Sequence, residues 1–593
     1  MKLAAFVFGA IPLLIQFYSK KYLQEDKTAT LTELENDLNL PRFKEFDFIV
    51  VGAGPAGCII AGRLSERFNV LLLEAGGEPV PASQVPFFAI PVATDRDTNY
   101  FWPSLPQRYA AQDTDGIITV HLGKMFGGSD SHNEMVHLRG SPHDYDNYAR
   151  ILNDSSWRYE NVLEHFKKYE NFIGALFTGE YEENYGHGGP ITIDTDVPAF
   201  LPIWFDVARE LGYPVGDPNG FQKESFAPMA KNIKNGQRSN AYNEYIKPYK
   251  NTRQNLTVLP YSTATQILID DNKNAYGVLY ERHGIPQIAH ASKEVIISAG
   301  IFSSPLLLMK SGVGPRDQLE EAGVPVKHEL ASVGQNLGDH LHLSISDIQY
   351  NASILPYVPR MPEDREFEDM LQEYIETGEG ILGILQEGVV GYVVSSRAKQ
   401  AGEETWPDIQ FAYDPMCPAP SGDDLPTSCF YLFNGRTKMR GEMRLNATAY
   451  KNGVKNDVEL ALIDYRVFEG EAASDMDVLL EGIDNWMRVI NSTTMQKFGT
   501  VYAQEPHPSC TQHEFLSQDY WRCFVTRTVS LGLHGVGTCS LGSVLDSKFR
   551  VQGISGLRVA DASVFPVVPN SNLNSPIMMM AEKASADILQ TWV

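Results

Sequence analysis

One short unit near the front of the chain restricts the possible folds more than any other feature. Residues 46–51, FDFIVV, form the apolar run typical of a buried parallel strand, and GAGPAG follows directly. A helix is expected over residues 56–67, and a second strand, NVLLL, ends just before Glu74. This order of strand, helix and strand predicts an α/β domain built on a Rossmann-like, doubly wound sheet.

Gly52, Gly54 and Gly57 form a G-x-G-x-x-G motif inside this unit. The first glycine permits the tight turn, the second lets a pyrophosphate approach the backbone, and the third lets the helix pack closely on the strand. The free N–H groups at the start of the helix suit phosphate oxygens. Glu74 suits ribose hydroxyls and would repel a ribose phosphate, so FAD or NAD is expected rather than NADP. The alternative is a purely structural glycine turn.

The bulk properties limit the function classes. The chain has 593 residues, which is too long for one ordinary core and suggests two or three units. Its formal net charge of −25 disfavours a nucleic-acid partner, because phosphate binding needs a basic surface. The six cysteines show no zinc-ligand spacing, so no metal site is expected. Disulfides are expected for Cys417 with Cys429 and for Cys510 with Cys523, and Cys58 is expected to be a buried free thiol.

The first residues have the pattern of a targeting segment. Lys2 precedes an apolar run, residues 3–17, that is too short to cross a membrane comfortably. Residues 1–24 are therefore predicted to be a secretory signal or, because bulky residues crowd the cleavage position, an uncleaved N-terminal anchor. A secreted protein is expected, and a protein anchored in the lumen of the secretory pathway is the alternative. Asn-x-Ser/Thr triplets that fit an exported glycoprotein begin at Asn153, Asn255, Asn351, Asn446 and Asn491.

Four longer stretches carry a family resemblance. They are GKMFGGSDSHNEMVHLRG (123–140), GIFSSPLLLMKSGVGP (300–315), VGQNLGDH (333–340) and LRVADASVFPVVPNSNLNSPIMMMAEKASADIL (557–589). Together with the front unit they resemble the glucose–methanol–choline (GMC) family of FAD-dependent oxidoreductases. The resemblance runs from about residue 44 to the C-terminus.

The resemblance implies a discontinuous FAD-binding domain and a substrate domain of mixed α and β structure. The FAD-binding part is expected over residues 42–345 and the substrate domain over residues 346–525. A C-terminal segment, residues 526–593, is expected to return to the FAD domain and to bring the catalytic residues. Proline-rich turns and alternating apolar runs in the middle segment favour an antiparallel sheet that faces the flavin.

The same resemblance implies the residues that contact FAD. In SHN, residues 131–133, a histidine directly precedes the asparagine, as in relatives whose histidine is bonded to the flavin 8α-methyl group. Covalent FAD at His132 is therefore the hypothesis, and a histidine that only packs beside the ring is the alternative. Asp130 stands where Ser or Thr is typical; it would orient His132, disfavour the anionic reduced flavin or, more simply, bond the local backbone. The expected cofactor contacts are Gly52, Gly54, Gly57, Glu74, Gly127, Gly128, Ser129, His132, Asn133, Ala264, Asp561 and Ala562.

His534 stands in VSLGLHGVGTCSLG, residues 529–542, a segment otherwise suited to burial. A core histidine with one satisfied hydrogen bond is the ordinary interpretation. Oxidation of an alcohol, however, needs a base for the hydroxyl proton and a donor for the developing alkoxide. The resemblance places the base at His534, beside a Gly535 where proline is usual, and the donor at Asn574, with hydride transfer to FAD.

The resemblance further implies a small-molecule alcohol as substrate and either O2 or a quinone-like compound as electron acceptor. The many aromatic residues and the Asn-x-Ser/Thr triplets make the chain similar to the insect branch of the family, in which an ecdysone oxidase-like activity on an ecdysteroid 3-hydroxyl is the expected reaction. Glucose and salicyl-type aromatic alcohols are the alternative substrates. Two further readings stay open: an NAD enzyme, and an inactive flavin-fold protein with a binding role.

Overall fold

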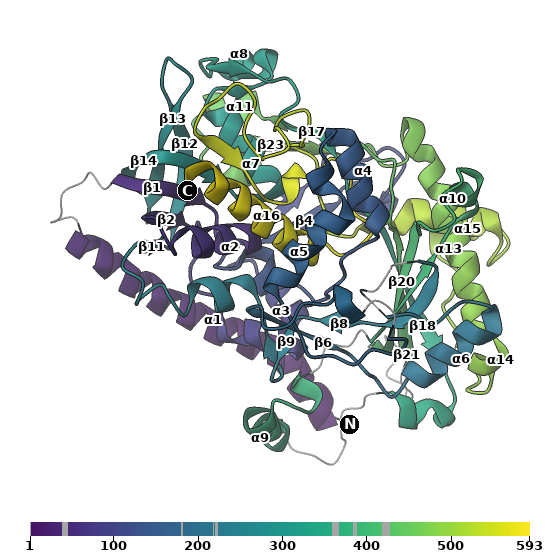
Figure 1. Ribbon diagram of the computed structural model, residues 1–593. Helices are drawn as coiled ribbons and strands as arrows, with labels where there is room; N and C mark the ends of the chain where they lie inside the picture. Colours follow the sequence, from purple (N-terminus) through teal and green to yellow (C-terminus); the bar gives the residue numbers. More distant parts are fainter. Residues whose placement is uncertain are drawn as a thin grey trace.

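The computed structural model describes residues 2–37, 45–179, 182–217, 219, 223–358, 367–383, 388–417 and 427–593. Two seven-stranded sheets organise these residues, one near each end of the molecule (Figure 1). This is the mixed α/β architecture expected from the sequence.

The first sheet gathers strands from three distant parts of the chain. Its central strand β1 (Glu45–Val51) is apolar and largely buried, as a parallel strand covered on both faces must be. The strand order is β11-β2-β1-β14-β13-β12, and β26 pairs with β14 on the far side. The strands from β11 to β14 and β26 are parallel, whereas β12 and β13 extend the sheet in antiparallel fashion. The remaining bounds are β2 Val70–Leu73, β11 Leu256–Leu259, β12 Ser262–Ile269, β13 Ala275–Arg282, β14 Ile285–Ile297 and β26 Leu557–Val559.

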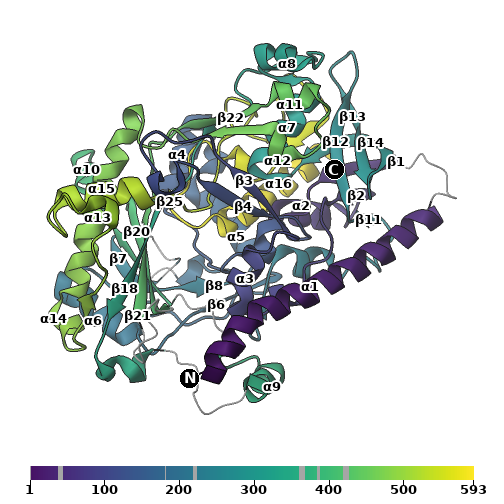
Figure 2. The same ribbon diagram turned by 180° about the vertical axis from the view of Figure 1, so that it is seen from behind.

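Helices cover this first sheet. α2 (Pro55–Leu64) follows β1 directly and begins with a proline, which suits the first turn of a helix. The C-terminal helix α16 (Asn574–Trp592) packs on α2 and on α5 (Tyr159–Tyr169), so the end of the chain lies beside its front (Figures 1 and 2).

The second sheet is antiparallel throughout and has the order β24-β18-β21-β20-β19-β7, with β25 paired to β18. Two of its strands lie wholly outside residues 346–525, β7 early in the chain and β25 just before His534, and β18 begins before residue 346. Helices α13 (Asp475–Ile490) and α15 (Gln518–Thr528) lie on its outer side (Figure 2). The strand bounds are β7 Ser225–Pro228, β18 Leu341–Gln349, β19 Val389–Val393, β20 Ile409–Cys417, β21 Thr427–Asn434, β24 Val501–Tyr502 and β25 Ser530–Leu531.

The N-terminal region forms one long helix, α1 (Lys2–Asp37), along the first sheet's side of the molecule (Figure 2). Leu23 packs with Val80, Val92 and Met125, and the Tyr261 hydroxyl donates to Asp26 at 2.5 Å. None of the helices in the described part of the chain is long and apolar enough to cross a membrane. The secretory signal and the export of the protein stay predictions.

The cysteines match the expectation where the structure describes them. Cys510 and Cys523 form a disulfide, which confirms that predicted pair. Cys58 is a buried free thiol, also as predicted, and Cys539 is a second one. The Cys417 side chain lies outside the described residues, so its pairing with Cys429 stays a prediction.

Candidate active site

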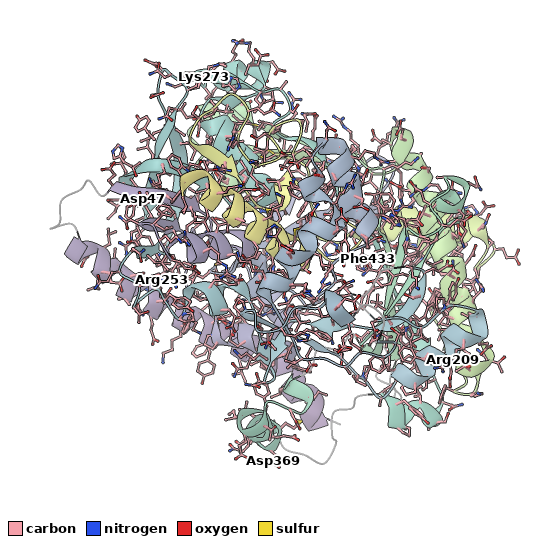
Figure 3. The ribbon with its side chains drawn as sticks, in the orientation of Figure 1. Asp47, Arg209, Arg253, Lys273, Asp369 and Phe433 are labelled. Carbon is pink, nitrogen blue, oxygen red and sulfur yellow. A yellow bond between two sulfur atoms is a disulfide. The ribbon has the colours of Figure 1, made fainter. Side chains whose placement is uncertain are left out.

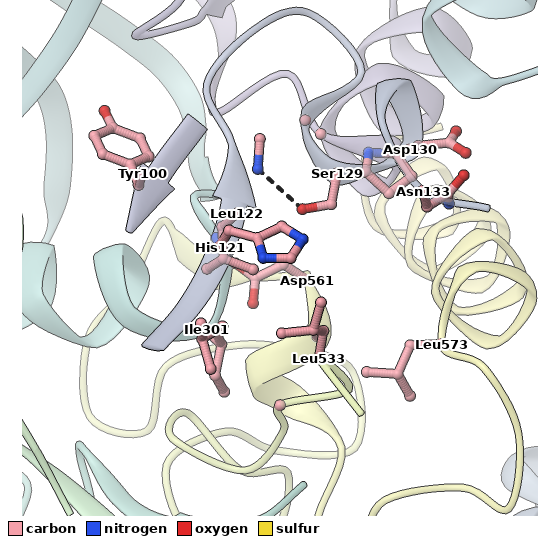
Figure 4. Close-up of a pocket in the computed structure, with 18 of the residues that line it drawn as sticks. Tyr100, His121, Leu122, Ser129, Asp130, Asn133, Ile301, Leu533, Asp561 and Leu573 are labelled. Atoms are coloured by element: carbon pink, nitrogen blue, oxygen red, sulfur yellow. Dashed lines mark hydrogen bonds between the residues drawn. The ribbon is translucent and has the colours of Figure 1, made fainter. Parts of the chain in front are cut away.

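A cavity of about 420 Å³ lies between the glycine-rich turn after β1 and the inner side of the second sheet. Figure 4 shows labelled lining residues from both ends of the chain, among them His121, Ser129 and Asp561. Every residue that the sequence analysis assigned to cofactor or substrate lines this cavity except Gly57 and Gly127. The chain therefore brings positions up to about five hundred residues apart to one site.

The glycine turn is closely packed at two of its three glycines and open at the third. A Cβ atom on Gly57 would lie 1.9 Å from the Gly52 carbonyl oxygen, and one on Gly52, whose φ is +98°, would lie 2.4 Å from the Ser298 carbonyl oxygen. A Cβ atom on Gly54 would meet nothing within 4 Å. Because Gly54 lines the cavity, this is the one glycine of the motif that leaves its space free for a ligand.

A second turn lies on the first. Gly127 donates its N–H to the Ala53 carbonyl at 2.7 Å, and a Cβ atom on Gly128 would lie 3.0 Å from the Gly54 Cα. Both residues have positive φ, which only glycine adopts without strain. The Ser129 hydroxyl then accepts the Gly123 N–H at 3.1 Å, the bond drawn in Figure 4. The GGS segment is thus fixed against the pyrophosphate turn.

Two carboxylates close the nucleotide end of the cavity. Glu74 accepts the Ala53 N–H at 2.9 Å and the Gly76 N–H at 2.8 Å, and burial raises the pKa of its carboxyl. Asp561 accepts the Gly300 N–H at 2.9 Å and the Ser563 N–H at 2.8 Å, which ties the loop after β26 to the start of α7 (Gly300–Lys310). Ala562 and, on β12, Ala264 line the same region.

His132 is held in one tautomer. The Asn99 amide donates to the carbonyls of Val92 and Asp95, both at 2.8 Å, so its oxygen faces His132 and accepts from the ring Nδ1. Burial, helped by the nearby His121 and Arg238, lowers the pKa of His132 to about 3. The imidazole is therefore neutral, with Nδ1 protonated and Nε2 bare.

Asp130 bonds neither His132 nor the local backbone, in contrast to the roles expected for it; its carboxylate interacts with the Asn133 side chain and with groups from distant segments. One carboxylate oxygen accepts the Ala241 N–H at 2.9 Å, and the other accepts the Asn574 amide at 2.8 Å. Burial raises the pKa of Asp130 to about 6. The carboxylate thereby orients Asn574 and occupies one N–H of that amide, leaving the other N–H free for a ligand.

Asn133 also has a structural task. Its side-chain oxygen accepts the Met135 N–H at 3.0 Å and the Arg238 guanidinium at 2.6 Å. Its role toward FAD stays a prediction.

His534 lines the cavity, and Asp339 and His340 hold it in position. Its backbone N–H donates to Asp339 at 2.8 Å, and its Nδ1 lies 2.9 Å from Nδ1 of His340. Burial, together with His340 and His342, lowers the pKa of His534 well below that of free histidine. A neutral imidazole beside a cavity is the state that a general base requires.

Several residues of the site were not predicted from the sequence. Asn99, Asp339 and His340 received no role, although VGQNLGDH contains the last two. The aromatic wall was also missed: Phe433 of β21, labelled in Figure 3, stacks on His342 with ring centroids 4.7 Å apart, and Tyr431 lies beside them. Period-two alternation in the strands is the signal that would have placed Tyr431 and Phe433 on one face.

The site fits FAD. The open space at Gly54 suits a pyrophosphate, Glu74 stands at the end of β2 where a ribose is expected, and His132 presents a bare nitrogen farther along the cavity. Among the described residues, no group of three or more His, Cys, Asp or Glu side chains is arranged to hold a metal ion.

Comparisons with known proteins show which proteins the whole chain resembles. The oxygen-dependent choline dehydrogenase 1 of Chromohalobacter salexigens is 32% identical over 563 residues, which cover 91% of this chain and 94% of the relative. The corresponding enzyme of Photobacterium profundum is 32% identical over 569 residues, covering 92% and 93%. These relatives are bacterial, so they do not support the expected insect, ecdysone oxidase-like branch.

Solved structures show the same fold. A formate oxidase superposes with a TM-score of 0.81 at 22% identity, over 93% of this chain and 99% of that one. A fungal aryl-alcohol oxidase superposes with a TM-score of 0.74 at 22% identity, over 92% and 99%. The GMC oxidoreductase profile matches residues 46–342 with its N-terminal part and residues 438–581 with its C-terminal part. The chain belongs to the GMC oxidoreductase family.

Proposed function

We propose that this FAD-dependent alcohol oxidoreductase acts on a bulky apolar alcohol, with His534 as the base and Asn574 as the hydrogen-bond donor to the substrate oxygen. The observation that carries the proposal is that a neutral His534 and an oriented Asn574 amide line one cavity with the glycine turn. FAD, when bound, accepts the hydride from the carbinol carbon.

The two side chains divide the work on the hydroxyl group. His534 takes the hydroxyl proton, because a neutral imidazole has a free lone pair and the alcohol is too weak an acid to ionise alone. The free N–H of Asn574 stabilises the negative charge that grows on the oxygen, and an amide does not compete for the proton. The Asp130 carboxylate holds that amide in place at 2.8 Å.

The wall of the cavity supports an apolar substrate. Its substrate end is lined by aromatic rings and by aliphatic side chains, namely His342, Tyr431, Phe433, Val136, Leu531, Leu533, Leu573 and Ile577. Such a surface favours a ring or long carbon skeleton over a sugar, whose hydroxyls would lose water without replacement hydrogen bonds. An ecdysteroid fits this description, as does an aromatic alcohol.

Choline is the second candidate substrate. Glu134 lines the cavity together with the same aromatic rings, and a carboxylate with aromatic faces suits a quaternary ammonium group. Choline oxidation is the activity in the names of the bacterial relatives.

Anaerobic mixing with ecdysone, benzyl alcohol, choline and glucose tests these assignments. We expect ecdysone or benzyl alcohol to bleach the flavin fastest. His534→Ala is expected to slow bleaching by roughly 10²- to 10⁴-fold, the range for loss of a general base. A change below threefold contradicts the role of His534. Bleaching by none of these compounds favours a binding protein, and a colourless purified protein favours an NAD enzyme.

We also propose that FAD is covalently bound through His132. His132 would hold FAD by its bare Nε2 at the 8α carbon; the new C–N bond would replace a C–H bond, and the two protons released, one from that carbon and one from the imidazole, would leave with the two electrons that dioxygen would take up as peroxide. Acid-precipitated protein is expected to keep its yellow colour, whereas His132→Ala releases it. Asn99→Leu is the matched control, because it removes the acceptor that keeps Nε2 bare and is expected to lower the bound fraction. Full release from the unaltered protein contradicts the bond.

The electron acceptor and the location complete the proposal. O2 is the proposed acceptor, with a quinone as the alternative, and peroxide formed per turnover distinguishes them. Secretion as a glycoprotein is proposed from the leader-like N-terminus and from three triplets whose asparagines are exposed, Asn153, Asn351 and Asn491. The Asn255 amide instead donates to the carbonyls of Ser65 and Phe68, so we expect that site to carry no sugar.

A further inference from the structure

We propose that His340 is a positioning residue that holds His534 in the tautomer with a bare Nε2. The proposal rests on the proposed role of His534 as the base. Without a fixed tautomer, a neutral imidazole presents either an N–H or a lone pair to the substrate, and only the lone pair can take a proton.

The hydrogen bonds of His340 show which of its two ring nitrogens carries the hydrogen. Its Nε2 lies 3.0 Å from the Gly435 carbonyl oxygen. A carbonyl oxygen only accepts hydrogen bonds, so Nε2 of His340 carries the hydrogen. Burial lowers the pKa of this histidine to about 4, and at neutral pH its other nitrogen, Nδ1, is therefore bare.

The contact between the two rings then decides which nitrogen of His534 carries the hydrogen. Nδ1 of His340 and Nδ1 of His534 lie 2.9 Å apart, and one of the two must donate. Because Nδ1 of His340 is bare, Nδ1 of His534 carries the hydrogen. His534 is itself neutral, so its Nε2 is bare, and the structure records no hydrogen bond from that atom to any described residue.

The backbone keeps the two rings in this relation. Gly532 donates its N–H to the His340 carbonyl at 2.9 Å, and His534 donates its N–H to Asp339 at 2.8 Å. The rings meet edge to face, with centroids 5.0 Å apart and planes at 81°. A Cβ atom on Gly532 would lie 2.9 Å from Nδ1 of His534, so the glycine leaves room for the contact.

Among the described residues, no carboxylate accepts a hydrogen bond from the His534 ring. Asp339 interacts with the backbone N–H groups of His534 and His340, and burial raises the pKa of its carboxyl to about 8, so it is mostly protonated at neutral pH. When His534 gains the substrate proton, its Nδ1–H keeps donating to a neutral imidazole. His340 thus fixes the tautomer before proton transfer and keeps the same hydrogen bond afterwards.

The test compares two substitutions at position 340. His340→Phe keeps an aromatic ring but removes the acceptor, whereas His340→Asn keeps an acceptor near the position of Nδ1. With the alcohol that bleaches the flavin fastest, we expect His340→Phe to slow flavin reduction by roughly 10²- to 10⁴-fold, the range for loss of general base catalysis, and His340→Asn to stay within about tenfold of the unaltered enzyme. His328→Gln, at a half-exposed histidine on β16 (His328–Glu329), is the control and is expected to leave the rate unchanged.

A spectroscopic measurement separates positioning from general damage. In protein labelled with ¹⁵N only on histidine, the His534 signals are those lost in His534→Asn. We expect the unaltered protein and His340→Asn to show Nδ1–H with bare Nε2, and His340→Phe to show the Nε2–H form.

The outcomes distinguish the two proposals. If His534→Ala slows reduction but His340→Phe stays within threefold, the base stands and the positioning role is overturned. If His534→Ala itself has no effect, the proposed function fails. If His340→Phe does not fold, the spectrum of the unaltered protein decides, because an Nε2–H signal on His534 overturns the inference without any variant.

Discussion

Two glycines of one motif should fail in different ways when each gains a methyl group. In Gly57→Ala the new Cβ would lie 1.9 Å from the Gly52 carbonyl oxygen, about 1.5 Å short of the 3.4 Å of an ordinary contact. The obstacle is backbone in a tight turn, so the cost should reach the upper end of the ~1–3 kcal/mol range for overpacking. In Gly54→Ala the methyl group meets nothing within 4 Å, and φ is −67°, which alanine adopts readily. A weaker N-cap and a stiffer unfolded chain then roughly cancel, to within about 1 kcal/mol.

The prediction is that Gly57→Ala loses stability and Gly54→Ala loses cofactor. Urea unfolding of the FAD-free proteins measures the first effect, and the ratio of flavin to protein after purification, with titration of added FAD, measures the second. We expect Gly54→Ala to unfold like the unaltered protein and to bind FAD at least tenfold more weakly, ~1.4 kcal/mol. If Gly54→Ala binds FAD as tightly as the unaltered protein, the claim that the cofactor lies against Gly54 is refuted. Unchanged stability of Gly57→Ala would refute the steric argument.

Three further changes test the groups that frame the site. Burial raises the pKa of Asp130 from 3.8 to about 6, so the free energy of unfolding falls by roughly 3 kcal/mol as pH rises through this window. Asp130→Asn should therefore make the free energy of unfolding, measured in urea, less dependent on pH between pH 4 and 7. An unchanged pH slope contradicts this. Burial opposes ionisation of Glu170, but Arg139, which donates to it at 2.5 Å, lowers its pKa to about 2. The ion pair therefore stabilises the fold above pH 4.5, and this effect is lost as pH falls toward 2. Glu170→Gln should lower the free energy of unfolding by ~3–5 kcal/mol at pH 7 and change it very little near pH 2. Cys510→Ser opens a loop of sequence separation 13 and should cost ~3 kcal/mol, an effect that a reducing agent should reproduce in the unaltered protein.

Local signals explain why the front of the fold was predictable. The strand expected at residues 46–51 is β1 at Glu45–Val51, and the expected NVLLL strand is β2 at Val70–Leu73. The helix begins one residue earlier than expected, at Pro55, and ends earlier, at Leu64. These elements depend on apolar runs and glycines a few residues apart, which is information that the sequence carries locally.

The strand pairing of the second sheet could not be predicted from such local signals. Its strands β7 and β25 are short and lie outside the middle segment, β7 more than a hundred residues before it, and they join the sheet through pairing with β19 and β18. A strand of two to four residues has no periodicity of its own to detect. Its place is decided by tertiary contacts, which depend on the whole chain.

The polar contacts of the site were unpredictable for a related reason. His340 and His534 are 194 residues apart, and Asp130 and Asn574 are 444 residues apart. Composition and motif give the residue types, but a tautomer depends on which carbonyl or amide lies within 3 Å. That distance is settled only when β18, α16 and the loops between them have packed.

The Asp130 contact explains the departure of this chain from the serine or threonine typical of its family. The side chain at this position receives the Ala241 N–H on one oxygen and the Asn574 amide on the other. A single hydroxyl has one oxygen, placed closer to the backbone, and cannot accept both bonds at the same geometry. Burial of the carboxylate is unfavourable, but the carboxylate orients Asn574. In the proposed mechanism the Asn574 amide faces the substrate oxygen, so Asp130 and Asn574 would act as one unit.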